Sequence, residues 1–374
     1  MSMIMEKKLG FGTMRLPLRE AQDPRSIDLE QFRQMADLYL ERGFCYFDTA
    51  YPYHEGLSEE AVRQCVAERY PRERFLLADK MPVYLVKGPE DYERIFSEQL
   101  RRCGVDYFDV YLLHNLGRDR YPNTERFGGF AFLRQLKEKG LARNIGFSFH
   151  DDAQMLDQIL TAHPEVDVVQ LQINYLDWNG AVAQSGRCYE VAKRHGKDVI
   201  VMEPVKGGQL AALPPAAMEQ FTAFYGESAP SPASLAIRFA ASLEQVKVVL
   251  SGMSSLAQVE DNSGFMQDFV PLSRAERELA GRIETELKRA IKVPCTSCRY
   301  CMEVCPNNIA IPNYFGLLNL HAVTGKKTNM YYQRYSLDHG KASDCIKCGR
   351  CEKNCPQHLP IRALLEEFRA LYED

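Results

Sequence analysis

Short apolar runs recur along the first three quarters of the chain, and stretches with helical spacing separate them. The runs are rich in β-branched and aromatic residues, which is typical of strands that are buried on both faces. They lie at 9–14, 45–50, 75–80, 109–114, 144–148, 168–174, 199–204 and 246–252. The amphipathic stretches between them include 29–43, 92–104, 131–140 and 186–196. A strand followed by a helix, repeated in this way, predicts a parallel sheet with covered faces.

The number and spacing of these units favour a closed sheet. Eight strand–helix units within about 250 residues are typical of a (β/α)8 TIM barrel. An open doubly wound sheet is the competing α/β fold, and its dinucleotide fingerprint is G-x-G-x-x-G. In GFGTMR (10–15) Arg15 takes the place of the third glycine. We therefore predict the barrel.

Composition indicates an ordinary globular protein. Of the 374 residues, 45% are hydrophobic and 26% are charged, which is enough for a sizeable core. A net charge of −4 gives no support for nucleic-acid binding. No apolar run approaches the roughly 20 residues that cross a bilayer, and the start of the chain lacks the features of a secretory signal. We expect a cytoplasmic protein with neither nucleic acid nor a membrane as partner.

Eight of the twelve cysteines lie in two near-copies, CTSCRYCMEVCP (295–306) and CIKCGRCEKNCP (345–356). Each copy reads C-x2-C-x2-C-x3-C-P. A reducing cytoplasm disfavours disulfides, and a structural zinc site needs neither the third cysteine step nor the final Cys-Pro. The other four cysteines stand singly among apolar neighbours and are predicted to be buried thiols: Cys45, Cys65, Cys103 and Cys188.

The full cysteine pattern resembles that of bacterial two-cluster ferredoxins, in which the fourth cysteine of each run binds the other run's [4Fe–4S] cluster. The resemblance implies one cluster on Cys295, Cys298, Cys301 and Cys355. It implies a second cluster on Cys345, Cys348, Cys351 and Cys305. The spacer at 311–336 is long and helical in character. We expect a barrel over 1–285 and a helix-rich, ferredoxin-like domain over 286–374.

Polar residues gather at or near the carboxyl ends of the predicted strands. They are Asp48, Lys80, His114, Ser148, Gln170, Asn174 and Glu203. Taken singly, Asp48 could cap the next helix, and His114 could be a core histidine with its hydrogen bonds satisfied. In a barrel, however, these strand ends converge on one mouth, where barrel enzymes have their active sites. Together they predict an active site.

Several segments resemble the aldo-keto reductases over about residues 9–270. In chain order they are GFGTMRLP, FDTAYPYHEG, ADK, YLLH, GFS, QLQINY and GMSSLAQVEDN. The resemblance implies that Tyr53 is the proton donor in carbonyl reduction, with Lys80 lowering the pKa of its phenol. Asp48 would hold Lys80 in place, and His114 would orient the substrate carbonyl.

The same resemblance implies a nicotinamide cofactor, NADP or NAD. The implied cofactor-binding residues are Gly12, Thr13, Met14, Ser148, Gln170, Glu203, Gly252, Met253, Gln258, Asp261 and Asn262. Glu203 stands where the family often stacks an aromatic ring on the nicotinamide. Gly252 and Gln258 stand where lysine and arginine often bind the 2′-phosphate. The choice between NADPH and NADH therefore stays open, and FMN is an alternative.

The sequence thus predicts an iron–sulfur oxidoreductase of aldo-keto reductase type that acts on a small carbonyl or alcohol substrate. A nicotinamide transfers two electrons as one hydride, whereas each cluster exchanges one electron. The clusters could relay electrons to an external one-electron carrier, work with a flavin-like mediator, or be structural. A ferredoxin-like protein whose barrel only docks a partner is the alternative; it predicts a degraded barrel site, yet Asp48, Tyr53, Lys80 and His114 are all present.

Overall fold

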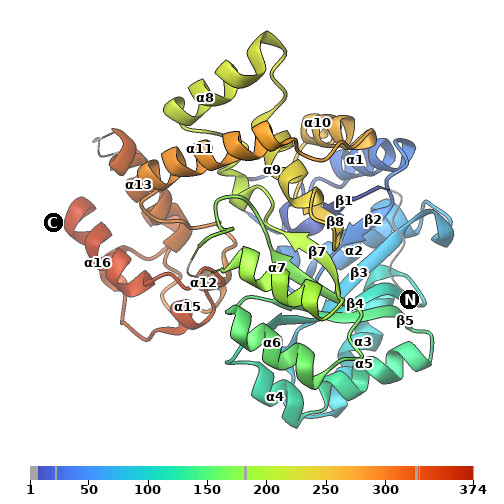
Figure 1. Ribbon diagram of the computed structural model, residues 1–374. Coiled ribbons are helices and arrows are strands. Elements are labelled where there is room, and N and C mark those ends of the chain that lie inside the picture. Colours follow the sequence, from blue (N-terminus) through green and yellow to red (C-terminus); the bar gives the residue numbers. More distant parts are fainter. Residues whose placement is uncertain (1–6, 22, 181–182, 325–326, 328, 374) are drawn as a thin grey trace. The chain divides into compact units, whose positions relative to one another are not determined.

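The computed structural model describes residues 7–21, 23–180, 183–324, 327 and 329–373. These residues form two compact units (Figure 1). The barrel unit comprises residues 1–204 and 233–273, and the cysteine-rich unit comprises residues 205–232 and 274–374. Within the described ranges, no helix is both long enough and apolar enough to cross a membrane.

Eight parallel strands close into a barrel in the order of the sequence. They are β1 (Leu9–Gly12), β2 (Tyr46–Asp48), β3 (Leu76–Met81), β4 (Phe108–Leu116), β5 (Ala142–Phe149), β6 (Val168–Gln172), β7 (Asp198–Met202) and β8 (Val246–Ser251). Strand β1 pairs with β2 on one side and with β8 on the other, which completes the ring. The predicted (β/α)8 barrel is confirmed.

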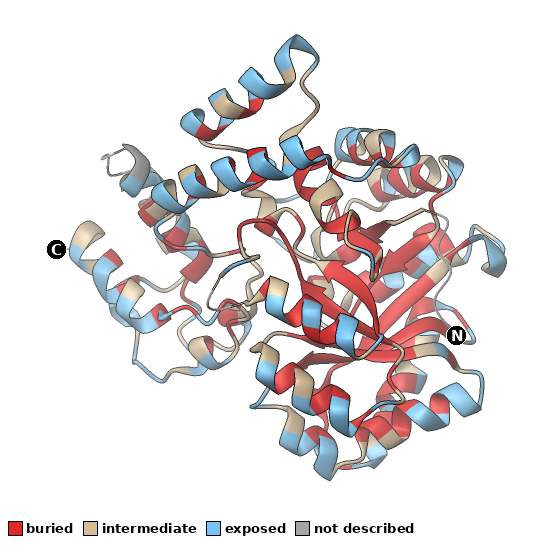
Figure 2. Cartoon of the chain, viewed as in Figure 1, coloured by how far each residue is buried: buried red, intermediate tan, exposed pale blue. Residues whose placement is uncertain are grey.

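The barrel interior is filled by apolar side chains from alternating strand positions, as expected for a packed barrel core. They are Tyr46, Ala78, Val110, Leu112, Val168, Ile200, Val248 and Leu250. Figure 2 shows the strands as a nearly continuous buried layer. Gly146 in β5 lies so close to β6 that an added Cβ would be 1.9 Å from the carbonyl oxygen of Val168. Only glycine fits at this position.

Helices cover the outside of the strands. Those of the barrel unit are α1 (Leu29–Glu41), α2 (Ser58–Val62), α3 (Glu90–Cys103), α4 (Tyr121–Arg126), α5 (Gly129–Glu138), α6 (Ala153–Ala162), α7 (Ser185–Arg194), α9 (Pro232–Ala241) and α10 (Leu256–Gln267). Helix α1 begins where Asp28 accepts a hydrogen bond from the Gln31 N–H at 3.1 Å, a typical N-cap. The four amphipathic stretches predicted from the sequence agree with α1, α3, α5 and α7 to within two residues at each end.

The cysteine-rich unit is helical, as predicted. Its helices are α8 (Pro215–Tyr225), α11 (Arg274–Ala290), α12 (Tyr300–Glu303), α13 (Ile311–Thr324), α14 (Asn329–Asp338), α15 (Arg350–Lys353) and α16 (Ile361–Tyr372). Tyr314 of α13 and Phe368 of α16 stack with 4.6 Å between ring centroids, inside a core that also contains Phe315, Leu318 and Leu365. The described part of the spacer at 311–336 is largely helical, because it contains α13 and most of α14.

The two cysteine motifs are structural repeats fifty residues apart. Helices α12 and α15 begin at matched places, and so do α13 and α16. Three matched pairs of residues have φ in the left-handed region: Ser297 with Lys347, Arg299 with Gly349, and Asn308 with His358. The shared pattern of six cysteine-loop residues indicates that each motif folds into the same tight loop.

The segment that follows β7 belongs to the cysteine-rich unit. The side chain of Gln209 donates a hydrogen bond to the carbonyl oxygen of Cys295 at 2.8 Å. Gly207 has a φ of 62°, and a Cβ there would lie 2.5 Å from the carbonyl oxygen of Thr296. Residues 205–210 therefore pack directly against the first cysteine motif. The domain boundary predicted between residues 285 and 286 stays a proposal.

Candidate active site

Lys80, near the end of β3, lies at the centre of the candidate site and is completely buried. Its ammonium group donates to Asp48 Oδ1 at 2.5 Å and to the carbonyl oxygen of Thr49 at 2.7 Å. It also lies 3.4 Å from the hydroxyl of Tyr53. Burial alone would lower the pKa of Lys80, but the nearby Asp48, Tyr53 and Asp79 together outweigh it, and the pKa is raised. Lys80 is therefore a fixed cation at neutral pH.

Asp48, the last residue of β2, bonds residues of β3 and β6 and of the turn that follows β1. Its Oδ2 accepts a hydrogen bond from Gln170 Nε2 of β6 at 3.1 Å. Its main-chain oxygen accepts one from the Thr13 hydroxyl at 3.0 Å. Burial raises the pKa of Asp48, and Lys80 opposes that rise. Gln170 and Thr13, both predicted cofactor residues, are thus brought to the Asp48–Lys80 pair.

Tyr53 begins a tight turn, Tyr53–Gly56, which is held by hydrogen bonds to the segment between β1 and α1. His54 and Glu55 have φ values of 53° and 54°. The His54 ring accepts a hydrogen bond from the Leu16 N–H at 3.2 Å and bonds the Pro24 carbonyl oxygen at 2.8 Å. Burial raises the pKa of Tyr53, while Lys80 lowers it by a smaller amount. Lys80 thus lowers the Tyr53 pKa as expected, but burial outweighs the lysine and the net shift is upward.

His114 of β4 lies beside Tyr53, with ring centroids 6.1 Å apart and the rings nearly perpendicular. Burial, followed by the charge of Lys80, lowers the pKa of His114 well below its usual value. The imidazole is therefore neutral at pH 7. The Tyr84 ring also lies near His114, with 6.4 Å between ring centroids, and Arg120 lies 5.7 Å from the Tyr84 ring centroid.

Behind Lys80 lies a buried polar network that the sequence did not reveal. Gln99 of α3 donates to Glu59 at 3.0 Å and to the main-chain oxygen of Lys80 at 3.1 Å. Asp79 accepts the Lys80 N–H at 2.7 Å. Burial, together with the nearby Glu59 carboxylate, raises the pKa of Asp79 well above its usual value. The network holds the backbone of Lys80.

Three predicted cofactor segments meet at Arg15. Its guanidinium lies 3.6 Å from Glu203, and its main-chain oxygen accepts a hydrogen bond from the Ser254 hydroxyl at 2.7 Å. A Cβ added to Gly252 would lie 3.2 Å from the Arg15 side chain. The 3-10 turn Thr13–Arg15, Glu203 and the stretch after β8 are thus neighbours. Arg15 was missed as a site residue, although its place in GFGTMR was the available signal.

The start of α10 follows that stretch directly. The Ser255 hydroxyl accepts the Gln258 N–H at 3.4 Å, which caps the helix. Gln258 Oε1 accepts the Ser254 N–H at 2.7 Å, and Asn262 donates to the Ser251 hydroxyl at 2.9 Å. The N-terminus of a helix favours a bound anion. Gln258 is exposed beside this helix end, as is Asp261 one turn further on, whereas Met253 and Asn262 are buried.

Ser148, at the end of β5, is also at the barrel mouth. Its hydroxyl oxygen accepts the Asn115 N–H at 2.7 Å. Asn115 has a φ of 60°, and its main-chain oxygen accepts a hydrogen bond from Arg120 at 3.2 Å. The strand ends of β4 and β5 are therefore held together at Ser148. Because the hydroxyl oxygen accepts this hydrogen bond, its O–H can donate to another group.

The cysteines of each predicted cluster set are electrostatic neighbours. Burial raises the pKa of Cys301, and the charges of Cys298, Cys295 and Cys355 raise it further. Burial likewise raises the pKa of Cys351 to about 11, with smaller contributions that include Cys345 and Cys305. Cys355 is thus a neighbour of Cys301, and Cys305 is a neighbour of Cys351, as the predicted exchange requires.

A cavity of about 330 Å³, including its open mouth, lies at the second cysteine motif. Its lining includes Cys305, Cys345, Cys348 and Cys351, the full set predicted for one cluster. The Ile309 N–H points at Cys305 Sγ over 3.5 Å. Four thiols around one apolar hollow fit an iron–sulfur cluster. Among the described residues, no group of three or more His, Cys, Asp or Glu side chains has the arrangement of a single-ion site.

Residues 8–279 match the model of the "Aldo/keto reductase family", which is well over half of the chain. The chain belongs to the aldo/keto reductase family. It is therefore an oxidoreductase, as predicted. Residues 294–359 match the model of the "4Fe-4S dicluster domain", so this family member carries an iron–sulfur domain after its barrel.

Relatives and solved structures support the family assignment. An aldo-keto reductase of Mycolicibacterium vanbaalenii is 29% identical over 60% of this chain and 73% of its own length. The NADH-specific methylglyoxal reductase of Escherichia coli is 27% identical over 46% of this chain and 57% of its own length. An aldo/keto reductase from Klebsiella pneumoniae in complex with NADP and acetate superposes with a TM-score of 0.59 at 20% identity, covering 74% of this chain and 91% of that one. This structural likeness shows the shared fold.

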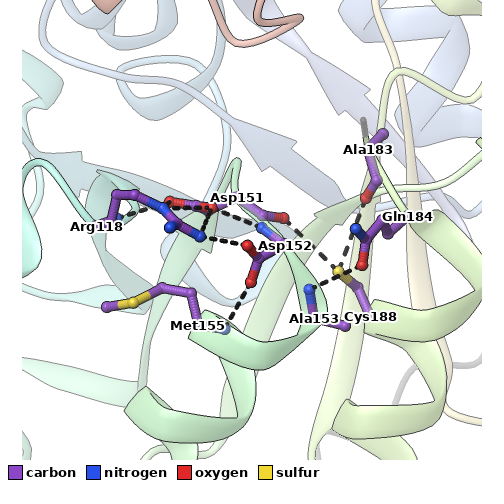
Figure 3. Close-up of polar contacts among 8 residues, drawn as sticks. All are labelled: Arg118, Asp151, Asp152, Ala153, Met155, Ala183, Gln184 and Cys188. Atoms are coloured by element: carbon purple, nitrogen blue, oxygen red, sulfur yellow. Dashed lines mark hydrogen bonds and ion pairs between the residues drawn. The ribbon is translucent and has the colours of Figure 1, made fainter. Parts of the chain in front are cut away.

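The rim of this aldo/keto reductase barrel is fastened by a polar network that the sequence did not predict. Figure 3 shows Arg118, after β4, directed at Asp151 and Asp152, after β5. Asp152 caps α6 by accepting the Met155 N–H at 2.9 Å. Gln184, which precedes α7, accepts the Ala153 N–H at 3.3 Å. Three successive strand–helix connections are thereby tied together.

The isolated cysteines lie away from the two cysteine motifs in the sequence. Cys65, Cys103 and Cys188 are buried as predicted. Cys45 is instead half-buried, so the prediction is wrong there. Burial raises the pKa of Cys188 to about 12, and its thiol faces the carbonyl oxygens of Asp151 and Ala183. Such a thiol is inert as a nucleophile at neutral pH.

Proposed function

We propose that the chain interconverts a small carbonyl compound and its alcohol with a nicotinamide cofactor, and that two [4Fe–4S] clusters relay electrons. The observation that carries the first part is the buried Lys80 ammonium, which bonds Asp48 and reaches the Tyr53 hydroxyl. Three ionisable groups fixed in this way beside a neutral histidine are typical of proton-transfer chemistry.

Tyr53 is the proposed proton donor. When a reduced nicotinamide is bound, it supplies a hydride to the carbonyl carbon. The Tyr53 hydroxyl gives its proton to the carbonyl oxygen, so that hydride and proton together convert the carbonyl into an alcohol. Because burial raises the pKa of Tyr53, the phenol is protonated before the reaction. That state suits reduction of a carbonyl.

Lys80 and His114 support this proton transfer. The Lys80 ammonium stabilises the phenolate that remains on Tyr53 after the transfer, and Asp48 compensates the lysine's buried charge. His114, which is neutral, can donate an N–H to the carbonyl oxygen without itself giving up a full proton. Lys80 thus stabilises negative charge on the Tyr53 oxygen, and His114 stabilises it on the carbonyl oxygen.

The proposed cofactor residues form two groups. Gln170 and Ser148 lie at strand ends next to Asp48 and Asn115, where they suit the nicotinamide amide. Gly252, Met253, Gln258, Asp261 and Asn262 surround the start of α10, whose N-terminus favours the phosphate groups of the adenosine end. The NADP complex of the Klebsiella pneumoniae reductase supports a nicotinamide in this fold. Glu203 beside Arg15 leaves the stacking position without an aromatic ring.

The cysteine-rich unit supports the second half of the proposal. One cluster is assigned to Cys295, Cys298, Cys301 and Cys355, and the other to Cys345, Cys348, Cys351 and Cys305. Each cluster, when bound, exchanges one electron. Two such clusters match the two electrons of one hydride, which favours a relay to or from an external one-electron carrier. A flavin such as FMN in the barrel would provide the step between hydride and single electrons.

The test uses protein purified without oxygen. We expect about eight irons per chain for two four-iron clusters, and we expect NADH or NADPH to bleach the cluster absorbance. Extraction of the non-covalent cofactor before the titration distinguishes a nicotinamide enzyme from a flavin-containing one.

A Tyr53→Phe variant is the matched control, because it should bind the nicotinamide and yet fail to reduce carbonyl substrates. Absence of nicotinamide binding would contradict the reductase proposal and would favour an electron-transfer protein with a docking barrel. Cluster absorbance that stays unchanged despite nicotinamide binding would contradict the relay.

A further inference from the structure

The two cysteine motifs share one backbone conformation but have different neighbours. Gln357 and Asn307 occupy matched places, each directly after the proline that ends its motif. The Asn307 side chain donates to the main-chain oxygen of Asp344. Gln357 Oε1 instead accepts a hydrogen bond from the Lys206 ammonium at 2.6 Å. The second motif thus has the Lys206 side chain beside the residue that follows its proline. At the matched place, the first motif has a backbone carbonyl.

Lys206 is held in this place under unusual conditions. It is 2% exposed, although burial of an ammonium group is costly unless the charge is compensated. Its φ is 49°, in the left-handed region that favours glycine, and Gly207 and Gly208 follow it. A glycine at this position would adopt the turn without strain. A buried lysine in strained backbone points to a use for its charge.

Lys206 lies beside the chain that carries Cys355. Its ammonium group bonds the side chain of Gln357, which is two residues beyond that cysteine. The same segment reaches the other end of this ligand set, because Gln209 donates to the main-chain oxygen of Cys295 at 2.8 Å. The segment after β7 thus contacts the chain at Cys295 and just after Cys355. The cysteine pattern assigns these two cysteines to one cluster.

The other motif is more open to water. Cys348 is exposed, Ile346 beside it is 65% exposed, and the cavity lined by these residues has an open mouth. The Lys347 side chain is 67% exposed and lies 3.2 Å from Glu366. Water and salt screen such a cation, so its influence on a nearby cluster is weak.

We propose that Lys206 raises the reduction potential of the cluster bound by Cys295, Cys298, Cys301 and Cys355 above that of the other cluster. The inference rests on the proposed two-cluster assignment. Reduction adds one electron to a cluster, and a buried cation stabilises the added negative charge. Net charge, hydrogen bonds to sulfur and solvent exposure are the properties that set such potentials. Electrons then enter at the exposed cluster and collect at the cluster beside Lys206, which fits an external one-electron donor.

The test is a redox titration of the full chain, followed by electron paramagnetic resonance, on wild type and three variants. Lys206→Met removes the charge, Lys206→Gly removes the charge and the backbone strain, and Lys206→Arg keeps the charge. In wild type we expect two distinct potentials. In both uncharged variants, we expect the reduction equilibrium of the higher-potential cluster to weaken at least tenfold. For one electron, this lowers its potential by about 59 mV or more. The lower potential should not change, and Lys206→Arg should resemble wild type.

Lys347→Met is the matched control, since it removes an exposed lysine from the other motif; we expect less than a threefold change in either equilibrium. Equal effects of the Lys206 and Lys347 changes, or no effect of either uncharged Lys206 variant, would overturn the inference. Loss of iron from both uncharged variants would show that Lys206 is a structural support, and the inference would be wrong. Wild-type protein with fewer than two clusters, found by iron analysis before any titration, would contradict the proposed function itself.

Discussion

Lys80 and Asp48 form a buried ion pair, with 2.5 Å between Nζ and Oδ1 and side chains that are 1% and 3% exposed. Lys80→Met leaves the Asp48 carboxylate buried without its counter-ion. We expect the barrel unit to lose about 3–5 kcal/mol of unfolding free energy, as is usual when one partner of a buried pair is removed. Urea unfolding followed by fluorescence of Trp178, the single tryptophan, measures this in the barrel unit.

The combined change Lys80→Met with Asp48→Asn is the control for that measurement. It removes both charges, so it should recover a large part of the lost stability. Equal stabilities of the single and the combined variant would mean that lost packing at Lys80, and not the stranded carboxylate, causes the effect.

Tyr53→Phe removes the proposed proton donor and keeps the ring. We expect kcat for carbonyl reduction to fall by at least roughly 100-fold, the usual range for loss of a general acid, while the Kd of the cofactor stays the same. Tyr51→Phe is a matched control, because the Tyr51 hydroxyl faces Glu98 at 3.4 Å. A Tyr53→Phe enzyme with undiminished turnover would exclude the tyrosine as the acid.

His114 makes folding stability depend on pH. Burial holds the pKa of His114 below its usual value in the folded chain, whereas the unfolded chain takes up a proton at about pH 6.5. Its contribution to stability is therefore present above about pH 6.5 and is lost as the pH falls below that value. In urea unfolding at several pH values, His114→Gln should have a smaller loss of stability between pH 7.5 and pH 5 than wild type. Parallel losses in both proteins would refute this role.

Cys305→Ser should remove one cluster only, because Cys305 lines the cavity at the second motif and belongs to the ligand set proposed for it. We expect iron content to fall by about half and the higher-potential cluster to persist. Cys188→Ser, which changes an isolated buried thiol, should keep all of its iron. Loss of all iron from Cys305→Ser would argue that the clusters cannot assemble separately.

Gln258→Arg should increase affinity for NADPH about tenfold with little change for NADH. A guanidinium at this exposed position can form a charge-assisted hydrogen bond with the 2′-phosphate, usually worth about 1.5–3 kcal/mol. The Ser254 N–H loses its present acceptor, which affects both cofactors alike. Calorimetric titration with each cofactor measures the ratio, and an unchanged ratio would place the 2′-phosphate elsewhere.

The barrel could be predicted from the sequence because its strands are buried on both faces and each is followed by an amphipathic helix. Residues at strand ends must then converge, which is why Asp48, Lys80 and His114 are found together. The cysteine pattern also led us to expect Cys355 near Cys301 and Cys305 near Cys351, and both pairs are neighbours. The ligand sets themselves stay a proposal.

Other features depend on tertiary packing and could not be read from the sequence. The acids Asp79 and Glu59 look like ordinary surface residues until folding buries them together. The direction of the Tyr53 pKa shift depends on the balance between burial and Lys80, and a motif does not give that balance. Nothing in residues 205–210 indicates that they pack on a cysteine motif ninety residues further along.

The fifty-residue repeat has a consequence for how the cysteine-rich unit could have arisen and how it can be divided. Matched loops and helices indicate a duplicated ancestor. With the proposed exchange of Cys305 and Cys355, however, each copy now completes its sibling's metal site. Neither copy alone would then contain a full set of ligands for a cluster. The two copies depend on each other, and the smallest cluster-binding fragment must contain both.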